Sequence, residues 1–178
     1  MATILTLTMN PALDVSTSVP FVLPDQKLRC GEPRYEPGGG GINVARAVHR
    51  LGGDALAWFP SAGPAGELLQ QLLRAEGVPQ TAVATRQWTR ENLNVLERAS
   101  GRQFRFCMPG ARLDEAEWRP FLDDDVIPDP APAFLVASGS LPPGAPVDFY
   151  AQLATRTRAR GRRLVLDTSG EPLARAVE

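Results

Sequence analysis

The sequence is poor in the residue types that build metal centres and nucleophilic triads. It contains one histidine, His49, and two cysteines, Cys30 and Cys107, among 178 residues. A histidine-based zinc site or a Ser-His-Asp triad therefore has almost no material to use. The two cysteines lie far apart in the sequence and have no cysteine neighbours, which favours free thiols in a reducing compartment.

Long apolar runs and an excess of one charge are also absent. No apolar run approaches the roughly 20 residues of a membrane span, and the first residues lack the basic segment and cleavage site of a signal peptide. The net charge is −1, with no long block of one sign. We therefore expect a cytoplasmic protein that has neither a membrane nor a nucleic acid as its partner.

Lysine occurs once, as Lys27, and all other basic side chains are arginines. Such a bias is typical of genomes in which arginine replaces lysine wherever the chemistry allows. Lys27 is therefore a candidate for a position that needs a compact ammonium group, although its survival by chance explains the sequence equally well.

Apolar segments with the periods of strands and helices alternate along the chain. This alternation predicts an α/β fold with a Rossmann-like, mostly parallel sheet flanked by helices, in one domain. The predicted strands are Thr3–Thr8, Ala55–Phe59, Ala133–Ala137 and Arg163–Asp167. The predicted helices are Ile42–Leu51, Ala65–Ala75, Glu115–Leu122 and Val147–Arg160. The proline-rich segment Pro128–Pro132 is interpreted as a local linker.

A second group of segments is extended but more polar, which predicts a small, half-exposed sheet. Ser100-Gly101 separates the last two of these segments and is typical of a hairpin turn. The segments are Lys27–Tyr35, Thr81–Arg86, Asn92–Arg98 and Gln103–Cys107.

The last segment reads as the start of a helix at Gly170-Glu171-Pro172. A parallel sheet that ends after Arg163–Asp167 would keep an unpaired edge. We therefore expect the sequence to be the N-terminal part of a longer domain whose C-terminal part is missing.

The strongest local motif is the glycine run Gly38–Gly41, which opens directly onto a helix through Ile42-Asn43. Glycines such as Gly39 and Gly40 let a ligand approach the backbone, and a helix start attracts negative charge. The Asn43 amide can donate and accept, which suits sugar hydroxyls. No Gly-Lys-Ser/Thr follows, so the motif is not a P-loop.

Three further segments follow predicted strands and should meet at the same sheet edge. Asn10-Pro11-Ala12-Leu13-Asp14 follows the first strand, and its carboxylate suits two sugar hydroxyls, although a turn aspartate is the simpler reading of this residue alone. Ser138–Gly144, which contains Ser140, and Asp167–Gly170 follow two later strands. Together the segments predict one shared crevice.

Three basic side chains, Lys27, Arg90 and Arg105, fall in or beside the polar extended segments. A phosphate on the substrate would need such cations, and arginine offers a two-pronged donor. For any single arginine, a solvated surface charge is the more common explanation.

These motifs together resemble the ribokinase-like, PfkB-type carbohydrate kinases. Gly38–Gly41 with Ile42-Asn43-Val44-Ala45 resembles the N-terminal glycine signature, and Asn10–Asp14 resembles the opening motif of the phosphosugar branch. Within the family, the segments Lys27–Cys30, Trp88–Leu93, Phe104–Gly110 and Ser138–Gly144 look most like the minor bacterial 6-phosphofructokinases.

The resemblance implies a Rossmann-like domain with a small β-sheet lid, here about 15–36 and 81–110 of a domain that runs from 1 to 178. It implies ATP and Mg²⁺ as cofactors, and a homodimer formed through the lid. Asp14, Gly39, Gly40 and Asn43 would then bind the sugar. The sugar phosphate would lie against Lys27, Arg90, Arg105 and Ser140, with Arg90 acting in its own or a neighbour's site.

The family's catalytic aspartate lies in a Gly-Ala-Gly-Asp motif, which this sequence lacks. The resemblance therefore implies no catalytic base in this chain and no direct metal ligand, with Asp167 only near the phosphoryl-transfer region. The chain alone is expected to be inactive.

Several functions remain open at this point. The first is phosphorylation of fructose 6-phosphate at the 1-hydroxyl by the intact enzyme, and the second is a 1-phosphofructokinase or tagatose-6-phosphate kinase. A third is a non-catalytic sugar-phosphate-binding fragment. A nucleoside kinase is disfavoured because it has less need of a cationic phosphate clamp.

Overall fold

The computed structural model describes residues 4–123 and 132–178, so the predicted linker 128–132 lies almost wholly outside the described residues. The described helices are α1 Gly40–Arg50, α2 Gly63–Ala75, α3 Glu115–Trp118, the 3₁₀ turn η1 Arg119–Phe121, α4 Phe149–Ala159 and α5 Glu171–Val177. The described strands are β1 Ile4–Leu7, β2 Ala12–Val19, β3 Arg34–Gly38, β4 Ala55–Ser61, β5 Gln80–Ala84, β6 Arg90–Glu97, β7 Gln103–Cys107, β8 Phe134–Ser138 and β9 Arg163–Asp167.

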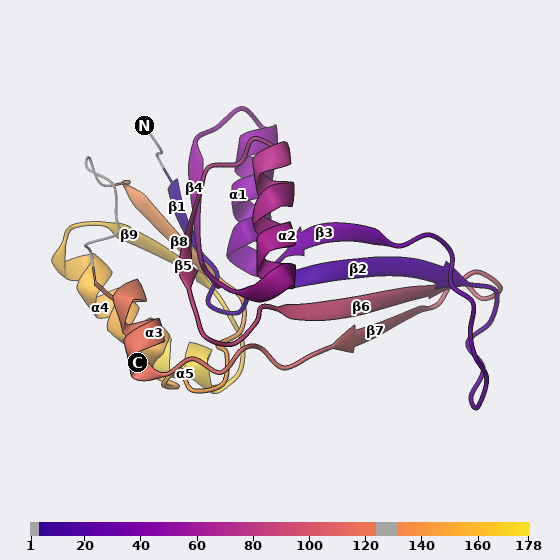
Figure 1. The fold of residues 1–178 in the computed structure, drawn as a ribbon. Coiled ribbons are helices and arrows are strands. Elements are labelled where there is room, and N and C mark those ends of the chain that lie inside the picture. The colour runs from indigo at the N-terminus through magenta and orange to yellow at the C-terminus, as the bar shows by residue number, and fades with distance from the viewer. Residues whose placement is uncertain (1–3, 124–131) are drawn as a thin grey trace.

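Five parallel strands form the main sheet, in the order β5-β4-β1-β8-β9. Helices α1 and α2 cover one face and α3, α4 and α5 the other (Figure 1). Successive residues of a strand point to opposite faces, so Trp58 packs in one core with Phe121 and Phe149, while Phe59 packs in the other with Leu69. The predicted α/β class, with a mostly parallel sheet flanked by helices, is confirmed.

Four other strands form the small sheet, in the order β3-β2-β6-β7, and project from the main body (Figure 1). The pairing is antiparallel at β2–β3 and β6–β7 and parallel at β2–β6. The predicted hairpin around Ser100-Gly101 is confirmed by the β6–β7 pairing. The two sheets meet where the chain passes from β1 into β2 and from β3 into α1.

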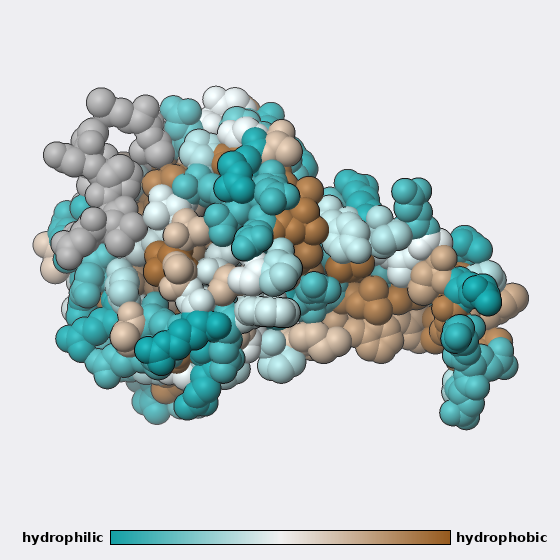
Figure 2. All heavy atoms as spheres, viewed as in Figure 1, coloured by the Kyte–Doolittle hydropathy of each residue, from teal (hydrophilic) through white to brown (hydrophobic). Residues whose placement is uncertain are grey.

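The two faces of the small sheet differ in chemistry because its side chains alternate. One face carries polar groups at matched positions: Asp14 on β2, Asn92 on β6 and Glu36 on β3. The other face carries an apolar row that crosses all four strands, Tyr35, Val15, Leu93 and Phe106. We call these the polar face and the apolar face; brown surface on the small sheet is visible in Figure 2.

Three strand predictions need correction. The extended run predicted over 81–86 forms β5, which pairs with β4 in the main sheet rather than joining the small sheet. A short polar run suits the edge of either sheet, and the crossover through α2 places this one parallel to β4. Residues 12–19, read partly as a loop, form β2. Of the strand predicted over 27–35, only 34–35 belong to β3, because Pro33 has no backbone N–H to donate to a ladder.

The predicted helices are all present with shifted ends, and α1 starts two residues earlier than expected, inside the glycine run. The predicted helix over 115–122 is a single α turn followed by the 3₁₀ turn η1, where Pro120 stands. Among residues 4–123 and 132–178, no helix has the length and apolar character needed to cross a membrane.

Candidate functional site

The loops after β1 and β8 and the start of α1 meet at the carboxyl end of the main sheet. The loop after β1 and the loop after β8 are joined by one side-chain hydrogen bond, from Asn10 Nδ2 to Ser140 Oγ at 3.1 Å. The start of α1 is tied to the same edge, since the Ile42 amide donates to Thr8 Oγ1 at 2.8 Å. The structure therefore brings three of the predicted segments together at one sheet edge, as open α/β sheets do at ligand sites.

The glycine run is needed first for packing. A Cβ on Gly40 would overlap the Ser138 side chain, and one on Gly41 would overlap the carbonyl of Leu7. A Cβ on Gly38 would overlap the Asp14 carboxylate, and Gly39 has a φ of 120°, which L side chains rarely adopt. The glycines let the start of α1 lie directly against the ends of β1 and β8, with Asp14 beside the turn.

Asp14 lies on the polar face of β2, so it is a strand residue rather than a turn residue. Its Oδ1 accepts a hydrogen bond from Asn92 Nδ2 at 2.9 Å, across the β2–β6 pairing. Asn92 in turn accepts from the Met108 amide through Oδ1 at 3.2 Å. Asn92 was not predicted as a site residue, although the alternating polar residues of β6 were the signal for it.

Asn43 is exposed in the first turn of α1. Its amide N–H donates to Gly39 O at 2.9 Å, and its side-chain Oδ1 lies 3.4 Å from Arg46 Nη1. The sequence did not point to Arg46, which is buried on α1. The amphipathic pattern of the helix does not show that this arginine is buried, and only the packing of the folded chain does.

Arg90 is half-buried and its guanidinium binds backbone carbonyls. It donates to Asn10 O at 3.0 Å, to Pro11 O at 3.4 Å and to Met108 O at 2.8 Å. Burial lowers the pKa of Arg90 from its ordinary value. Arg90 therefore ties the loop after β1 to the end of β7, in addition to any contact with a ligand.

The other two predicted cations lie farther out. Arg105 is exposed on the polar face, with Nε 3.3 Å from Asn94 Oδ1, and it borders an open groove of about 230 Å³. Lys27 is exposed in the loop between β2 and β3. That loop lies at the end of the small sheet remote from the main body (Figure 1), so the fold does not bring Lys27 to Asp14 of its own chain.

Asp167 ends β9 and is bound to the loop after β8. Ser138 Oγ donates to Asp167 Oδ2 at 2.9 Å, and the Gly139 amide donates to Asp167 O at 2.9 Å. Tyr150 donates its hydroxyl to Gly139 O at 2.9 Å, and burial raises the pKa of Tyr150. In residues 4–123 and 132–178, no group of three or more histidine, cysteine, aspartate or glutamate side chains gathers as a metal site would require.

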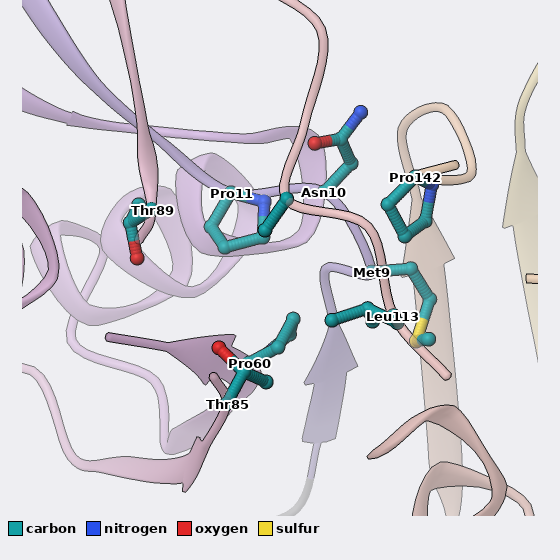
Figure 3. A pocket seen from close by; sticks show the side chains of 9 residues that line it. Met9, Asn10, Pro11, Pro60, Thr85, Thr89, Leu113 and Pro142 are labelled. Atoms are coloured by element: carbon teal, nitrogen blue, oxygen red, sulfur yellow. The ribbon is translucent and has the colours of Figure 1, made fainter. Parts of the chain in front are cut away.

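A small enclosed cavity lies behind Asn10, closed by Met9, Leu113 and Pro142 (Figure 3). Its volume of about 10 Å³ leaves room for roughly one water molecule. The cavity is too small for a sugar. A ligand would instead lie on the open surface formed by the glycine run, Asp14 and the polar face.

Comparison with known proteins agrees with this architecture. The pfkB family carbohydrate kinase profile matches residues 5–178. The chain is 49% identical over 177 residues to the ATP-dependent 6-phosphofructokinase isozyme 2 of Escherichia coli, covering 99% of this chain and 57% of that protein. It is 51% identical over 167 residues to the protein of the same name from Mycobacterium tuberculosis, covering 94% of this chain and 49% of that protein.

Among solved structures, the fold matches phosphofructokinase-2 from Escherichia coli in complex with fructose-6-phosphate. The TM-score is 0.91 at 47% identity, over 99% of this chain and 58% of that chain. The chain thus spans about half the length of the relatives that it matches.

Proposed function

The chain belongs to the pfkB family of carbohydrate kinases, and from this premise we propose that it carries the sugar-phosphate site of an ATP-dependent fructose 6-phosphate kinase. In the whole protein, the γ-phosphoryl group of ATP would pass to the 1-hydroxyl, giving fructose 1,6-bisphosphate. The observation that carries the proposal is the Asp14 carboxylate, held by Asn92 beside the glycine run. The cytoplasm remains the predicted location.

The sugar hydroxyls would be bound where the glycine run meets the polar face. An ionised carboxylate only accepts hydrogen bonds, so Asp14 suits two hydroxyl donors. Gly39 and Gly40 leave the backbone accessible beside it, and Asn43 stands at the other end of the turn. This arrangement would hold the sugar by several directed hydrogen bonds and fix the orientation of its reacting end.

The sugar phosphate would lie toward Ser140, Arg90 and Arg105. Arg90 is anchored within its own chain by three carbonyl groups, so we place it in the site of its own chain rather than in that of a neighbour. Lys27, at the remote end of the small sheet, would reach a phosphate only in the site of a partner chain. Because the phosphate is bound away from the reacting hydroxyl, its binding energy can be used to align that hydroxyl.

Asp167 fits a role near Mg²⁺. Mg²⁺ keeps several waters and takes one or two carboxylates together with substrate phosphates, so a single exposed carboxylate suits contact through water. Bound there, Mg²⁺ would neutralise phosphate charge. The Asp167 orientation is set by the hydrogen bond from Ser138.

The apolar face of the small sheet supports a homodimer. Tyr35, Leu93 and Phe106 are 43%, 36% and 48% exposed, and they form one row with Val15. A contiguous apolar patch on a projecting sheet is typical of a protein–protein interface. We propose that the small sheets of two copies pack through these faces.

The site is tested by titrating the ¹⁵N-labelled chain with fructose 6-phosphate while following its NMR spectrum. We expect fructose 6-phosphate to bind more tightly than fructose 1-phosphate or tagatose 6-phosphate. Asp14→Asn should weaken that binding at least about tenfold, because the amide replaces an acceptor with a donor. Asp25→Asn, in the exposed loop, is the matched control and should bind as the wild type does.

Absence of fructose 6-phosphate binding to the wild-type chain would contradict the proposal, as would equal binding of all three sugar phosphates. A coupled assay with MgATP on the same chain should show no turnover. Turnover would mean that a catalytic base lies within these 178 residues.

The dimer is tested by sedimentation velocity of Leu93→Lys. A buried ammonium in the apolar row should shift the chain toward monomer, while the circular dichroism spectrum of the folded chain stays unchanged. Leu51→Lys, at an exposed position (88%) away from the small sheet, is the control and should leave the mass unchanged. A monomeric wild-type chain would refute the interface.

A further inference from the structure

Arg46 is a buried charged side chain to which the proposed function gives no role. It lies on α1 and only 9% of its surface is exposed. Burying a guanidinium is costly unless all its donors are matched, and replacing such a group by apolar side chains often stabilises a protein. Its presence in the core therefore calls for a reason other than stability.

Four of the five N–H groups of the Arg46 guanidinium donate hydrogen bonds. Nε and Nη2 donate to the two carboxylate oxygens of Glu76 at 2.8 and 2.6 Å, which is a bidentate pair. Nη1 donates to Pro37 O at 3.1 Å and to Asn43 Oδ1 at 3.4 Å. Nη2 also lies 3.8 Å from Glu36 Oε1. The hydrogen bond between Arg46 and Glu76 lowers the pKa of Glu76 and raises that of Arg46.

Two of these partners stand on either side of the glycine run. Pro37 precedes Gly38, which lies against Asp14, and Asn43 follows Gly41 in the first turn of α1. The anchor of Arg46, Glu76, comes at the end of α2, between the core residues Leu73 and Val78. One guanidinium therefore ties both ends of the sugar-binding turn to the main core.

The contact also determines which end of the Asn43 amide faces Arg46. A guanidinium has donors only, so the group that faces it must be the carbonyl oxygen, Oδ1. Nδ2 is then directed away from Arg46. With this orientation Asn43 offers hydrogen-bond donors, and its partner on a ligand must be an oxygen that accepts.

We propose that Arg46, anchored by Glu76, is a positioning residue that holds the Asn43 amide so that its NH₂ group donates to an oxygen of the bound sugar phosphate. This inference rests on the proposed function for the identity of the ligand. Lysine would keep the charge but not the planar fork, which alone reaches Glu76, Pro37 and Asn43 together. Arg46→Lys therefore separates positioning from charge.

The first experiment is made without ligand, on the full 178-residue chain. The side-chain NH₂ signals of Asn43 are assigned in the ¹H–¹⁵N spectrum by their loss in Asn43→Ala. Arg46→Lys and Glu76→Gln should each move these signals. Arg50→Lys is the matched control, because exposed Arg50 also reaches Glu76, at 3.4 Å, and it should leave them in place. Signals that stay in place in both test variants would overturn the proposal.

The second experiment is a double-mutant cycle on the dissociation constant of fructose 6-phosphate. Arg46→Lys and Asn43→Ala should each raise it about tenfold, and the double variant should be no weaker than Asn43→Ala alone, because Arg46 acts through Asn43. If the two single effects on the dissociation constant multiply in the double variant, the proposal is overturned. Two residues that act independently would give this result. If Arg46→Lys does not fold, as judged by circular dichroism, Glu76→Gln replaces it in the cycle.

The two experiments separate the failure of this inference from the failure of the proposed function. If the wild-type chain does not bind fructose 6-phosphate but Arg46→Lys moves the Asn43 signals, the ligand is wrong and the positioning stands. If the chain binds fructose 6-phosphate but the signals of Asn43 are unaffected, the proposed function stands and the role of Arg46 fails.

Discussion

The central strands β1 and β4 of the main sheet bury both of their faces, whereas strands of the small sheet expose two faces of different chemistry. Leu7 and Phe59 in the main sheet are fully buried, while Leu93 and Phe106 in the small sheet are 36% and 48% exposed. The central strands of a parallel sheet covered by helices must be apolar on both sides, but a projecting sheet needs only one apolar face. The main sheet therefore buries most of the core, while the small sheet leaves one polar and one apolar face open to solvent.

The largest expected effect comes from a matched pair of truncations in the two sheets. Phe59→Ala should lower the free energy of unfolding by about 3–5 kcal/mol, because it empties a fully buried site. Leu93→Ala, in the small sheet, should cost about 1 kcal/mol or less in the monomer, because the site is open to water. Urea unfolding followed by circular dichroism measures both, and similar losses would contradict the division between the sheets.

A smaller effect is expected where the two regions join. Gly40→Ala should lower the free energy of unfolding by about 2–3 kcal/mol, because its Cβ would overlap Ser138 and force α1 away from β8. Without that overlap, alanine in a helix would stabilise the protein. Adding Ser138→Gly should recover part of the loss in chemical unfolding. A Gly40→Ala chain as stable as the wild type would show that the junction is not tightly packed.

The smallest expected effect is that of the ion pair between Glu76 and Arg46, and its size should depend on pH. The pKa of Glu76 is lowered in the folded chain by the hydrogen bond from Arg46, so its contribution is present above its unfolded pKa and lost as pH falls through the folded value. Glu76→Gln should cost about 1.5 kcal/mol of unfolding free energy at pH 7. The difference from wild type should shrink below about pH 4. A constant difference between pH 7 and pH 3, measured by urea unfolding, would contradict the ion pair.

The strands and helices of the main sheet were predictable because each shows its apolar pattern within a short stretch of sequence. Apolar runs such as 55–59 and 163–167, separated by helices with an apolar stripe, admit few arrangements other than a covered parallel sheet. The small sheet was predicted less well. Strand β2, Ala12–Val19, mixes polar and apolar residues and was interpreted partly as a loop. Strand β5 was assigned to the wrong sheet. Short polar strands take their partner from long-range pairing, which periodicity does not encode.

Some residues of the candidate site were likewise indicated by local sequence, and others were not. The glycine run, Asp14 and Asn43 were recognisable because each stands in a motif with a local chemical meaning. Asn92 and Arg46 were not, since their roles depend on a strand pairing 78 residues apart and on an ion pair 30 residues apart. Lys27 was grouped with Arg90 because both fall in or beside the polar extended segments, yet Lys27 lies in the loop between β2 and β3, at the remote end of the small sheet, and Arg90 at the start of β6, beside the main body (Figure 1).

The amino-acid sequence was enough to predict the class of the fold and the family, because these depend on residue type and local spacing. The pairing of the strands, the open faces of the small sheet and the separation of Lys27 from Asp14 became apparent only in the folded chain. These properties depend on contacts between segments that are far apart in the sequence. Such contacts form together, as the two cores and the two sheets pack.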